Sequence, residues 1–317
     1  MINLSYHLSE EIKENLSIVD KLRTQILTTP LKPRTENLLK YQSDIEKAYW
    51  GLTLAKNPIT KTQAYKLMSK PLPKKLNDYQ KEVVSYIETL RLIREYWTAS
   101  KSQISSKNIL EIYNISCKSV FGSTSTYFRS KESEVADILK FIESGNDHPV
   151  IQAGLLQIEI TKLSPFENGT GRVAKLLSHL MFSKHGYDLR GLLILEDYYR
   201  SDLVSLKEAL ESIEKDKNAT FWLEYFTEGV KKSYQNTLKL VTDPTKSKFS
   251  PNFYKLSDRQ KSIMEKMNNP EVKISNKEVC KMFKISQITA SRDLSKMVNL
   301  GLLLPHNKGR STFYTKA

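Results

Sequence analysis

The chain has 317 residues, enough for about two or three domains, and its 39% hydrophobic and 26% charged residues are typical of a packed globular protein, not of a disordered or fibrous one. It contains no apolar run near the ~18 residues of a membrane span, and its start lacks the pattern of a secretory signal, so we expect a cytoplasmic protein with no membrane contact. Two distant cysteines, Cys117 and Cys280, argue against a disulfide framework and a zinc site.

The formal net charge of +14 is concentrated near the C-terminus. Residues 251–317 contain 13 Lys and Arg against 5 Asp and Glu, so about a fifth of the chain carries more than half of the surplus. Such a surplus is typical of a segment that contacts nucleic acid, although a lysine-rich, solvated surface would produce it too. The C-terminal segment is therefore the candidate for a nucleic-acid contact.

Residues 1–76 predict a helical N-terminal region that packs on the domain that follows. Apolar residues recur there at spacings of three and four, as on one face of a helix: Ile12, Leu16, Val19, Leu22 and Ile26. Pro30 and Pro33 interrupt this helix. A second helix follows, and Asn57 with Pro58 ends it.

Residues 77–240 predict a second, nearly all-helical domain. Its first helix runs from Asn77 to about Trp97, with Asn77 or Asp78 as the cap. The Ser- and Thr-rich residues 120–133 interrupt the helices and alternate enough to suggest a short β-hairpin. Residues 241–253 contain two prolines and small polar residues, which indicates a linker.

A glycine-bearing turn, SPFENGTGRVAK, lies between two of these helices at residues 164–175. Pro165 ends the helix before it, and Gly169 and Gly171 let backbone amides at the start of the next helix approach a ligand. Arg172 and Lys175 supply positive charge on the same helix. Taken alone, this pattern fits a helix that starts with a tight turn equally well.

The residues around this turn, 148–199, resemble the core of Fic proteins, whose motif reads HPFx(D/E)GNGRxxR. The residues that match the motif are Pro165, Phe166, Gly169, Gly171 and Arg172. The resemblance implies a mainly α, helical Fic fold over residues 77–240, with the hairpin as a flap. Family members typically transfer AMP from ATP to a hydroxyl group of a target protein, with Mg²⁺ bridging the phosphates. ATP and Mg²⁺ are therefore the implied ligands.

Four positions depart from the family motif. Ser164 replaces the histidine that acts as general base, and the loss of a positioned base typically costs ~10²–10⁴ in rate. Asn168 replaces the acidic metal ligand and offers only an uncharged carbonyl oxygen, so we assign it as the one candidate metal contact. Thr170 replaces the anion-hole asparagine, and Lys175 replaces the last arginine, which keeps the charge but loses the bidentate geometry. The implied nucleotide- or anion-binding residues are Asn168, Gly169, Thr170, Gly171, Arg172 and Lys175.

Two further interpretations concern the same site. A nucleophilic role for Ser164 would need an adjacent base, and His148 and His179 lack the spacing of a catalytic triad.

Many Fic proteins also carry an inhibitory helix with the pattern (S/T)xxxE(G/N). Aligned with this pattern, residues 46–51 place Glu46 at the hydroxyl position and Trp50 at the position of the glutamate. The inhibitory glutamate would then be lost. The alternative is an unrelated helix in which Trp50 is a core anchor.

Residues 254–317 resemble a winged helix-turn-helix domain. Ser275 and Glu278 form a capping box for a short helix, and Ser286 caps a second helix that Gly301 ends. Two short apolar runs then flank PHNKGR, which predicts a hairpin, the wing.

In such a domain the second helix enters the major groove and the wing meets the adjacent backbone. We expect four residues of that helix to face the core: Ile288, Leu294, Met297 and Leu300. Arg292 is the first candidate for a base contact, followed by Gln287 and Thr289, with Ser291 also on the outer face. The candidates for phosphate contacts are Lys296, Lys308 and Arg310. Winged helices also dock proteins, but the charge surplus favours double-stranded DNA.

The sequence leads to two hypotheses. The first is a degenerate Fic-like protein, impaired in AMP transfer, that acts through DNA binding as a regulator and whose helical body senses a nucleotide or forms a homodimer. The second is an active adenylyltransferase that uses a non-histidine mechanism and that its winged helix brings to a DNA-associated target.

Overall fold

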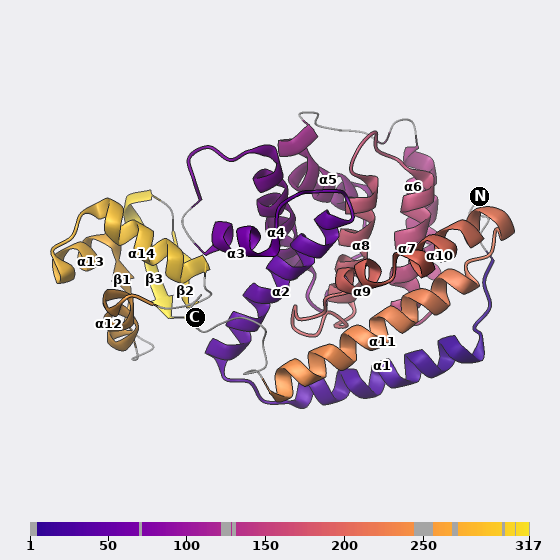
Figure 1. The fold of residues 1–317 in the computed structure, drawn as a ribbon, viewed down its shortest axis with the longest axis horizontal. Helices are drawn as coiled ribbons and strands as arrows, with labels where there is room; N and C mark the ends of the chain where they lie inside the picture. The colour runs from indigo at the N-terminus through magenta and orange to yellow at the C-terminus, as the bar shows by residue number, and fades with distance from the viewer. Residues whose placement is uncertain are drawn as a thin grey trace.

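The structure, a computed structural model, describes residues 5–69, 72–121, 128, 131–243, 256–267, 272–299, 302–307 and 309–316. Residues 5–243 form a helical body (Figure 1). Its helices are α1 (Glu10–Thr28), α2 (Pro33–Thr53), α3 (Lys61–Met68), α4 (Asp78–Trp97), α5 (Ser106–Phe121), α6 (Glu132–Ser144), α7 (Pro149–Leu163), α8 (Thr170–Lys184), α9 (Glu196–Ser201), α10 (Leu203–Asp216) and α11 (Thr220–Thr242). None of the helices in the described part of the chain combines the length and apolarity that crossing a membrane requires.

Helix α7 lies at the centre of the body. Every residue from Val150 to Ile160 is buried, the pattern of a helix surrounded by others, and α7 packs on α6, α8 and α11. Gly154 permits the close approach of α11, because a Cβ atom there would lie 3.0 Å from Phe226. The Trp222 indole N–H of α11 donates to the Gly154 carbonyl oxygen at 2.9 Å. The two helices that flank the motif turn, α7 and α8, therefore have fixed positions.

A buried polar cluster joins three helices of the body, and a lysine of a fourth acts on it electrostatically. This Glu196 cluster consists of Glu196 (α9), His179 (α8) and Tyr86 (α4), with Lys47 (α2) nearby. Glu196 is 1% exposed, and its Oε1 accepts hydrogen bonds from His179 Nε2 at 2.7 Å and from the Tyr86 hydroxyl at 3.0 Å. Burial alone would raise the pKa of Glu196, but His179 and Lys47 hold it below its ordinary value of 4.5. The carboxylate is therefore charged in the folded protein at neutral pH.

The remaining described residues, 256–316, form a smaller C-terminal unit, which lies at one end of the body in Figure 1. Its elements are α12 (Asp258–Lys266), β1 (Ile274–Ser275), α13 (Asn276–Phe283), α14 (Gln287–Asn299), β2 (Leu303–His306), a 3-10 turn (Gly309–Ser311) and β3 (Phe313–Lys316). The strands form an antiparallel sheet in the order β1-β3-β2. The expected capping box is present, because the Ser275 hydroxyl accepts from the Glu278 amide while the Glu278 carboxylate accepts from the Ser275 amide.

Two expected features fall mostly outside the described residues. In the expected hairpin at 120–133, α5 continues to Phe121, while residues 122–127 and 129–130 are not described. Of the expected linker, 241–253, the structure describes only residues 241–243, of which the first two belong to α11.

The Glu196 cluster predicts that Glu196→Gln destabilises the fold strongly at neutral pH. The amide keeps the shape but leaves Lys47 and His179 without the carboxylate, and removal of one partner from a buried charge pair costs about 3–5 kcal/mol. Urea unfolding followed by circular dichroism measures the loss.

The same variant tests the pH dependence. The pKa of Glu196 is lower in the folded than in the unfolded chain, so its contribution is present above about pH 4.5 and is lost as the pH falls through the folded-state pKa. The difference in unfolding free energy between Glu196→Gln and the wild type should therefore decrease at acidic pH. Glu208→Gln, at an exposed site, is the control; equal stability of all three proteins at pH 7 would contradict the assigned role.

Candidate functional site

The motif loop, residues 164–169, joins the end of α7 to the start of α8. Ser164 adopts the left-handed conformation (φ 47°, ψ 62°), and its amide donates to the Ile160 carbonyl oxygen at 3.0 Å, which closes α7. Its side chain is exposed. His148 caps α7 and His179 belongs to the Glu196 cluster, so both histidines weighed as bases for Ser164 are engaged elsewhere.

Buried contacts anchor the motif loop to the body. The ring of Phe166 is 1% exposed and stacks on Tyr113 of α5, with 4.1 Å between the ring centroids. The Thr170 hydroxyl donates to the Phe166 carbonyl oxygen at 3.3 Å, and the Lys131 ammonium donates to the Leu163 carbonyl oxygen. The loop is thus held at its middle and at both ends.

The first turn of α8 presents backbone amides. Gly169 has a positive φ of 82°, which glycine adopts without strain, and its carbonyl oxygen accepts from the amides of Arg172 and Val173, each at 3.0 Å. The amides of Thr170 and Gly171 precede these first bonds, where a helix offers N–H groups to an anion. Space is open beside Gly171, since a Cβ atom there would come no closer than 4.0 Å to the nearest atom, Lys175 Nζ.

Arg172, which we expect to contact a bound anion, makes structural contacts within the body. It is 7% exposed; its Nη1 donates to the Ser116 carbonyl oxygen of α5 at 2.7 Å, and its Nη2 pairs with Glu82 Oε1 of α4 at 2.9 Å. The guanidinium therefore connects α8 to α4 and α5. No local pattern signals this, because Glu82 is far away in sequence.

Lys175 lies one turn further along α8. It is half-buried, and its Nζ donates to the Gly171 carbonyl oxygen at 3.1 Å. Burial lowers the pKa of Lys175, the Glu196 carboxylate opposes this, and Arg172 adds to it. A bound anion could replace the single backbone acceptor, so Lys175 is the cation best placed to contact a ligand at this helix start.

The acidic positions of the loop offer little for a metal ion. Glu167 and Asn168 are exposed, and Asn168 can supply only an uncharged oxygen. Among the residues described, no cluster of three or more His, Cys, Asp or Glu side chains is placed to hold a metal. The groups that the loop and α8 present are therefore backbone amides, Lys175 and the uncharged side chain of Asn168, together with the carboxylate of Glu167.

The two α2 residues aligned with the inhibitory pattern contact α3. The Trp50 indole N–H donates to Glu46 Oε2 at 2.9 Å, and Lys61 of α3 pairs with Glu46 Oε1 at 2.5 Å. The Tyr65 hydroxyl donates to the same Oε1 at 3.0 Å. Trp50 is half-buried, and it borders a pocket rather than filling the core.

In the C-terminal unit, α14 carries most of the residues expected to contact DNA. Gln287, Ser291 and Arg292 are exposed, as the outer-face assignment requires. Thr289 and Lys296 are half-buried, and the Thr289 amide donates to Ser286 Oγ at 3.2 Å. Lys308, the side chain of Arg310 and Leu300 lie outside the described residues.

Ile288 was expected in the core but is 66% exposed. Ala290, fully buried, takes the inner position with Leu294 and Met297. The helical period explains the error: residue 290 lies four before 294 and seven before 297, on the same face, whereas residue 288 is turned away from it. The first turn of α14 therefore exposes an apolar side chain among polar ones.

A buried carboxylate fixes α14 to α12. Asp293 is buried, and its two oxygens accept from Arg259 Nε at 2.5 Å and from Gln260 Nε2 at 2.7 Å.

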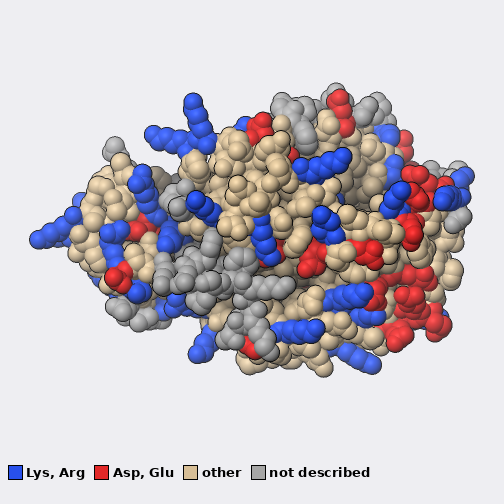
Figure 2. All heavy atoms as spheres, in the orientation of Figure 1, with Lys and Arg blue, Asp and Glu red and all other residues tan. Residues whose placement is uncertain are grey.

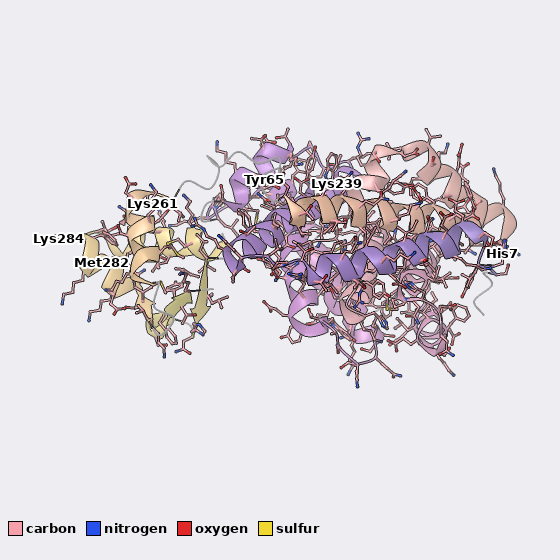
Figure 3. All side chains as sticks on the ribbon, turned by 90° about the horizontal axis from the view of Figure 1, so that it is seen from below. His7, Tyr65, Lys239, Lys261, Met282 and Lys284 are labelled. Carbon is pink, nitrogen blue, oxygen red and sulfur yellow. The ribbon has the colours of Figure 1, made fainter. Side chains whose placement is uncertain are left out.

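Figure 2 shows Lys and Arg side chains extending from the C-terminal unit and the neighbouring part of the body, while Asp and Glu gather at the opposite end. In Figure 3, Met282 and Lys284 lie at the outer end of the unit.

Comparisons with known proteins identify the fold. No protein-family model matches the sequence, and no curated protein matches it. Among solved structures, a Fic family protein from Desulfovibrio desulfuricans G20 matches with a TM-score of 0.64 and 15% identity, over 99% of this chain and 98% of that one.

Two more solved structures match over a smaller part of the chain. A Fic domain containing signaling protein from Bacteroides thetaiotaomicron VPI-5482 has a TM-score of 0.56 and 18% identity, over 76% of this chain and 100% of that one. Fic-1 (aa134–508) from C. elegans has a TM-score of 0.55 and 17% identity, over 72% and 71% of the two chains. The chain thus has the fold of Fic proteins.

Proposed function

We propose that this protein is a Fic-fold regulator that binds double-stranded DNA through a C-terminal winged helix. The observation that carries the proposal is the order α12-β1-α13-α14-β2-β3, with its three-stranded sheet and an exposed polar face on α14. In a winged helix the second helix of the pair enters the major groove. Here that helix is α14.

The first turns of α14 suit base recognition. Gln287 and Arg292 carry side chains that bond to base edges, and Ile288 adds an apolar surface of the kind that contacts a thymine methyl group. Asp293 is buried against Arg259, so its negative charge is neutralised within the unit. The exposed Lys277, Lys281 and Lys284 supply charge for phosphate contacts.

The Fic-fold body supports nucleotide binding more than AMP transfer. At the position of the family's base, Ser164 is exposed and weakly basic, and Asn168 provides no negative charge for Mg²⁺. The open start of α8 with Lys175 still fits phosphates. The body thus acts as a nucleotide sensor. The second candidate, an active adenylyltransferase without a histidine base, is favoured only by the retained loop geometry.

Charge reversal at Arg292 tests the DNA interface. Arg292→Glu should weaken duplex binding at least tenfold and reduce the slope of log K against log salt by about 1, because a cation at the groove is lost. Lys207→Glu, an exposed site on α10 with the same change in net charge, is the control. Fluorescence anisotropy across a salt series measures both quantities, and equal behaviour of the two variants would remove α14 as the recognition helix.

Exposure of Ile288 predicts a sequence-dependent effect without a stability cost. Ile288→Ser should leave the thermal midpoint nearly unchanged, because the side chain is already in water. It should also abolish discrimination between a selected duplex and the same duplex with uracil in place of thymine, which lacks only the methyl group. If the wild type binds both duplexes equally, Ile288 makes no such contact.

Titration with ATP, with and without Mg²⁺, tests the sensor. We expect binding without AMP transfer, and Lys175→Ala should weaken binding about tenfold through the loss of one charge-assisted contact. Arg172→Ala should instead lower the thermal midpoint, since its guanidinium joins three helices. Transfer of radiolabelled AMP by the wild type would favour the adenylyltransferase, and the absence of ATP binding would reject the sensor.

A further inference from the structure

A pocket of about 410 Å³ opens in the body between α2, α3, α9 and α11. Its volume lies in the range of small-molecule sites, roughly 300–1,000 Å³. No residue of 164–175 lines it, so it does not belong to the motif loop. We call it the Ser43 pocket, after one of its lining residues. Figure 3 labels two of its lining residues, Tyr65 of α3 and Lys239 of α11.

Ser43 gives this pocket an unsatisfied polar group. The residue is 1% exposed, and its Oγ is buried without a hydrogen-bond partner among the described residues. Buried hydroxyl groups are normally bonded, because water is lost without compensation otherwise. On another wall, the hydroxyls of Ser233 and Thr237 donate to carbonyl oxygens of α11 at 2.8 and 2.9 Å and keep lone pairs to accept. The residues that line the pocket thus include one buried hydroxyl without a partner and two hydroxyls that can still accept.

Two aromatic side chains also line the pocket. Trp50 and Tyr65 both line the pocket, and Glu46 holds them in place by accepting from the indole N–H and the phenol hydroxyl. Leu192 and Leu240 add apolar surface. Held aromatic side chains present flat surfaces that favour a planar ring.

The charged side chains that line the Ser43 pocket have no net charge, with two carboxylates and two ammonium groups. Glu46 is paired with Lys61 at 2.5 Å, and the remaining charged residues are one carboxylate, Asp197, and one ammonium, Lys239. An anionic ligand would therefore gain little over a neutral one. We propose that the Ser43 pocket binds an uncharged, planar heteroaromatic molecule of nucleoside size, with the Ser43 hydroxyl as a hydrogen-bond partner.

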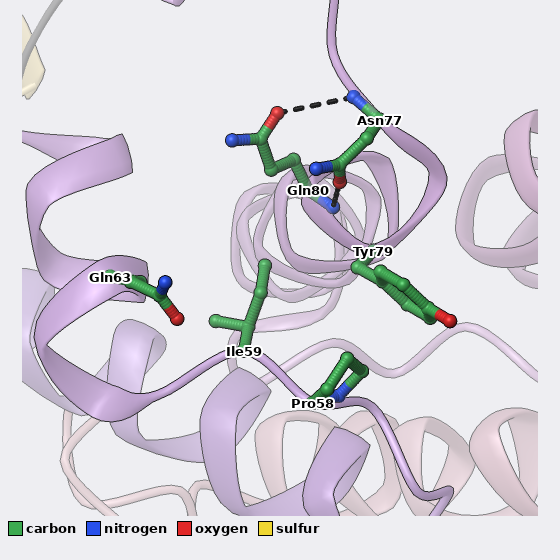
Figure 4. Close-up of a pocket in the computed structure, with 6 residues that line it drawn as sticks. All are labelled: Pro58, Ile59, Gln63, Asn77, Tyr79 and Gln80. Carbon is green, nitrogen blue, oxygen red and sulfur yellow. Dashed lines mark hydrogen bonds between the residues drawn. The ribbon is translucent and has the colours of Figure 1, made fainter.

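A second pocket differs from the Ser43 pocket in how its polar groups are bonded. It has about 290 Å³ and is lined by the residues drawn in Figure 4. Two of its polar residues already bind each other: the Asn77 backbone N–H donates to Gln80 Oε1 at 3.1 Å, and the Gln80 backbone N–H donates to Asn77 Oδ1 at 2.9 Å. These two bonds form the capping box at the start of α4, so they have a structural role.

Adenosine is the probe for the Ser43 pocket. We expect it to bind the full chain and to shift the NMR signal of the Trp50 indole N–H, assigned through Trp50→Phe. AMP, which adds a charged phosphate, should shift the same signal at no lower concentration. The proposal is overturned if millimolar adenosine leaves the signal in place, or if AMP acts on it more than tenfold more tightly.

Two serine variants separate binding from folding. Ser43→Ala removes an unpartnered hydroxyl, so it should leave the thermal midpoint unchanged or raise it, while adenosine affinity falls roughly tenfold. The control, Ser116→Ala, removes a fully buried hydroxyl that donates to the Ile112 carbonyl oxygen at 2.6 Å; it should lower the midpoint and leave the affinity unchanged. Unchanged adenosine affinity in Ser43→Ala would refute the assigned contact. Duplex binding tests a different unit, so the two proposals fail independently.

Discussion

The ionised carboxylate of Glu196, buried in the body, is the interaction on which the arrangement of the site depends. It bonds α9 to α8 through His179 and to α4 through Tyr86, and it lies in the field of Lys47 from α2. Arg172 adds a second link between α8, α4 and α5. Helix α8 is therefore held by charged contacts near its start, at Arg172, and in its second half, at His179, so its first turn extends from a fixed support.

Three of the residues that match the Fic motif have structural roles, whereas two of the four that depart from it have exposed side chains. Phe166 is buried against Tyr113, Gly169 adopts a positive φ, and Arg172 connects three helices. Ser164 and Asn168, by contrast, are exposed. These three positions thus support the folded loop, and the resemblance to the motif can persist without the chemistry. This supports our proposal that the body binds a ligand rather than transferring AMP.

Local patterns predicted most of the helices, the Asn77 and Ser275 caps and the order of elements in the C-terminal unit, because periodicity and capping act over a few residues. Local patterns failed where contacts between segments remote in sequence determine the environment of a residue. Glu82, which pairs with Arg172, is remote in sequence, so no local sequence pattern could predict the burial of Arg172. Ile288 was assigned to the wrong face because one apolar residue at a helix start does not define its phase. The unpartnered hydroxyl of Ser43 depends on what other helices place around it.

Helix α11 lines the Ser43 pocket with Ser233, Thr237 and Leu240, and among the described elements it directly precedes the C-terminal unit in the chain. A ligand in the pocket and a duplex on α14 would therefore act on opposite sides of one covalent connection. Any coupling between two such equilibria is reciprocal: if the ligand changes the affinity for DNA by some factor, DNA changes the affinity for the ligand by the same factor. The DNA-bound and free populations of the protein would then differ in how much of the small molecule they hold.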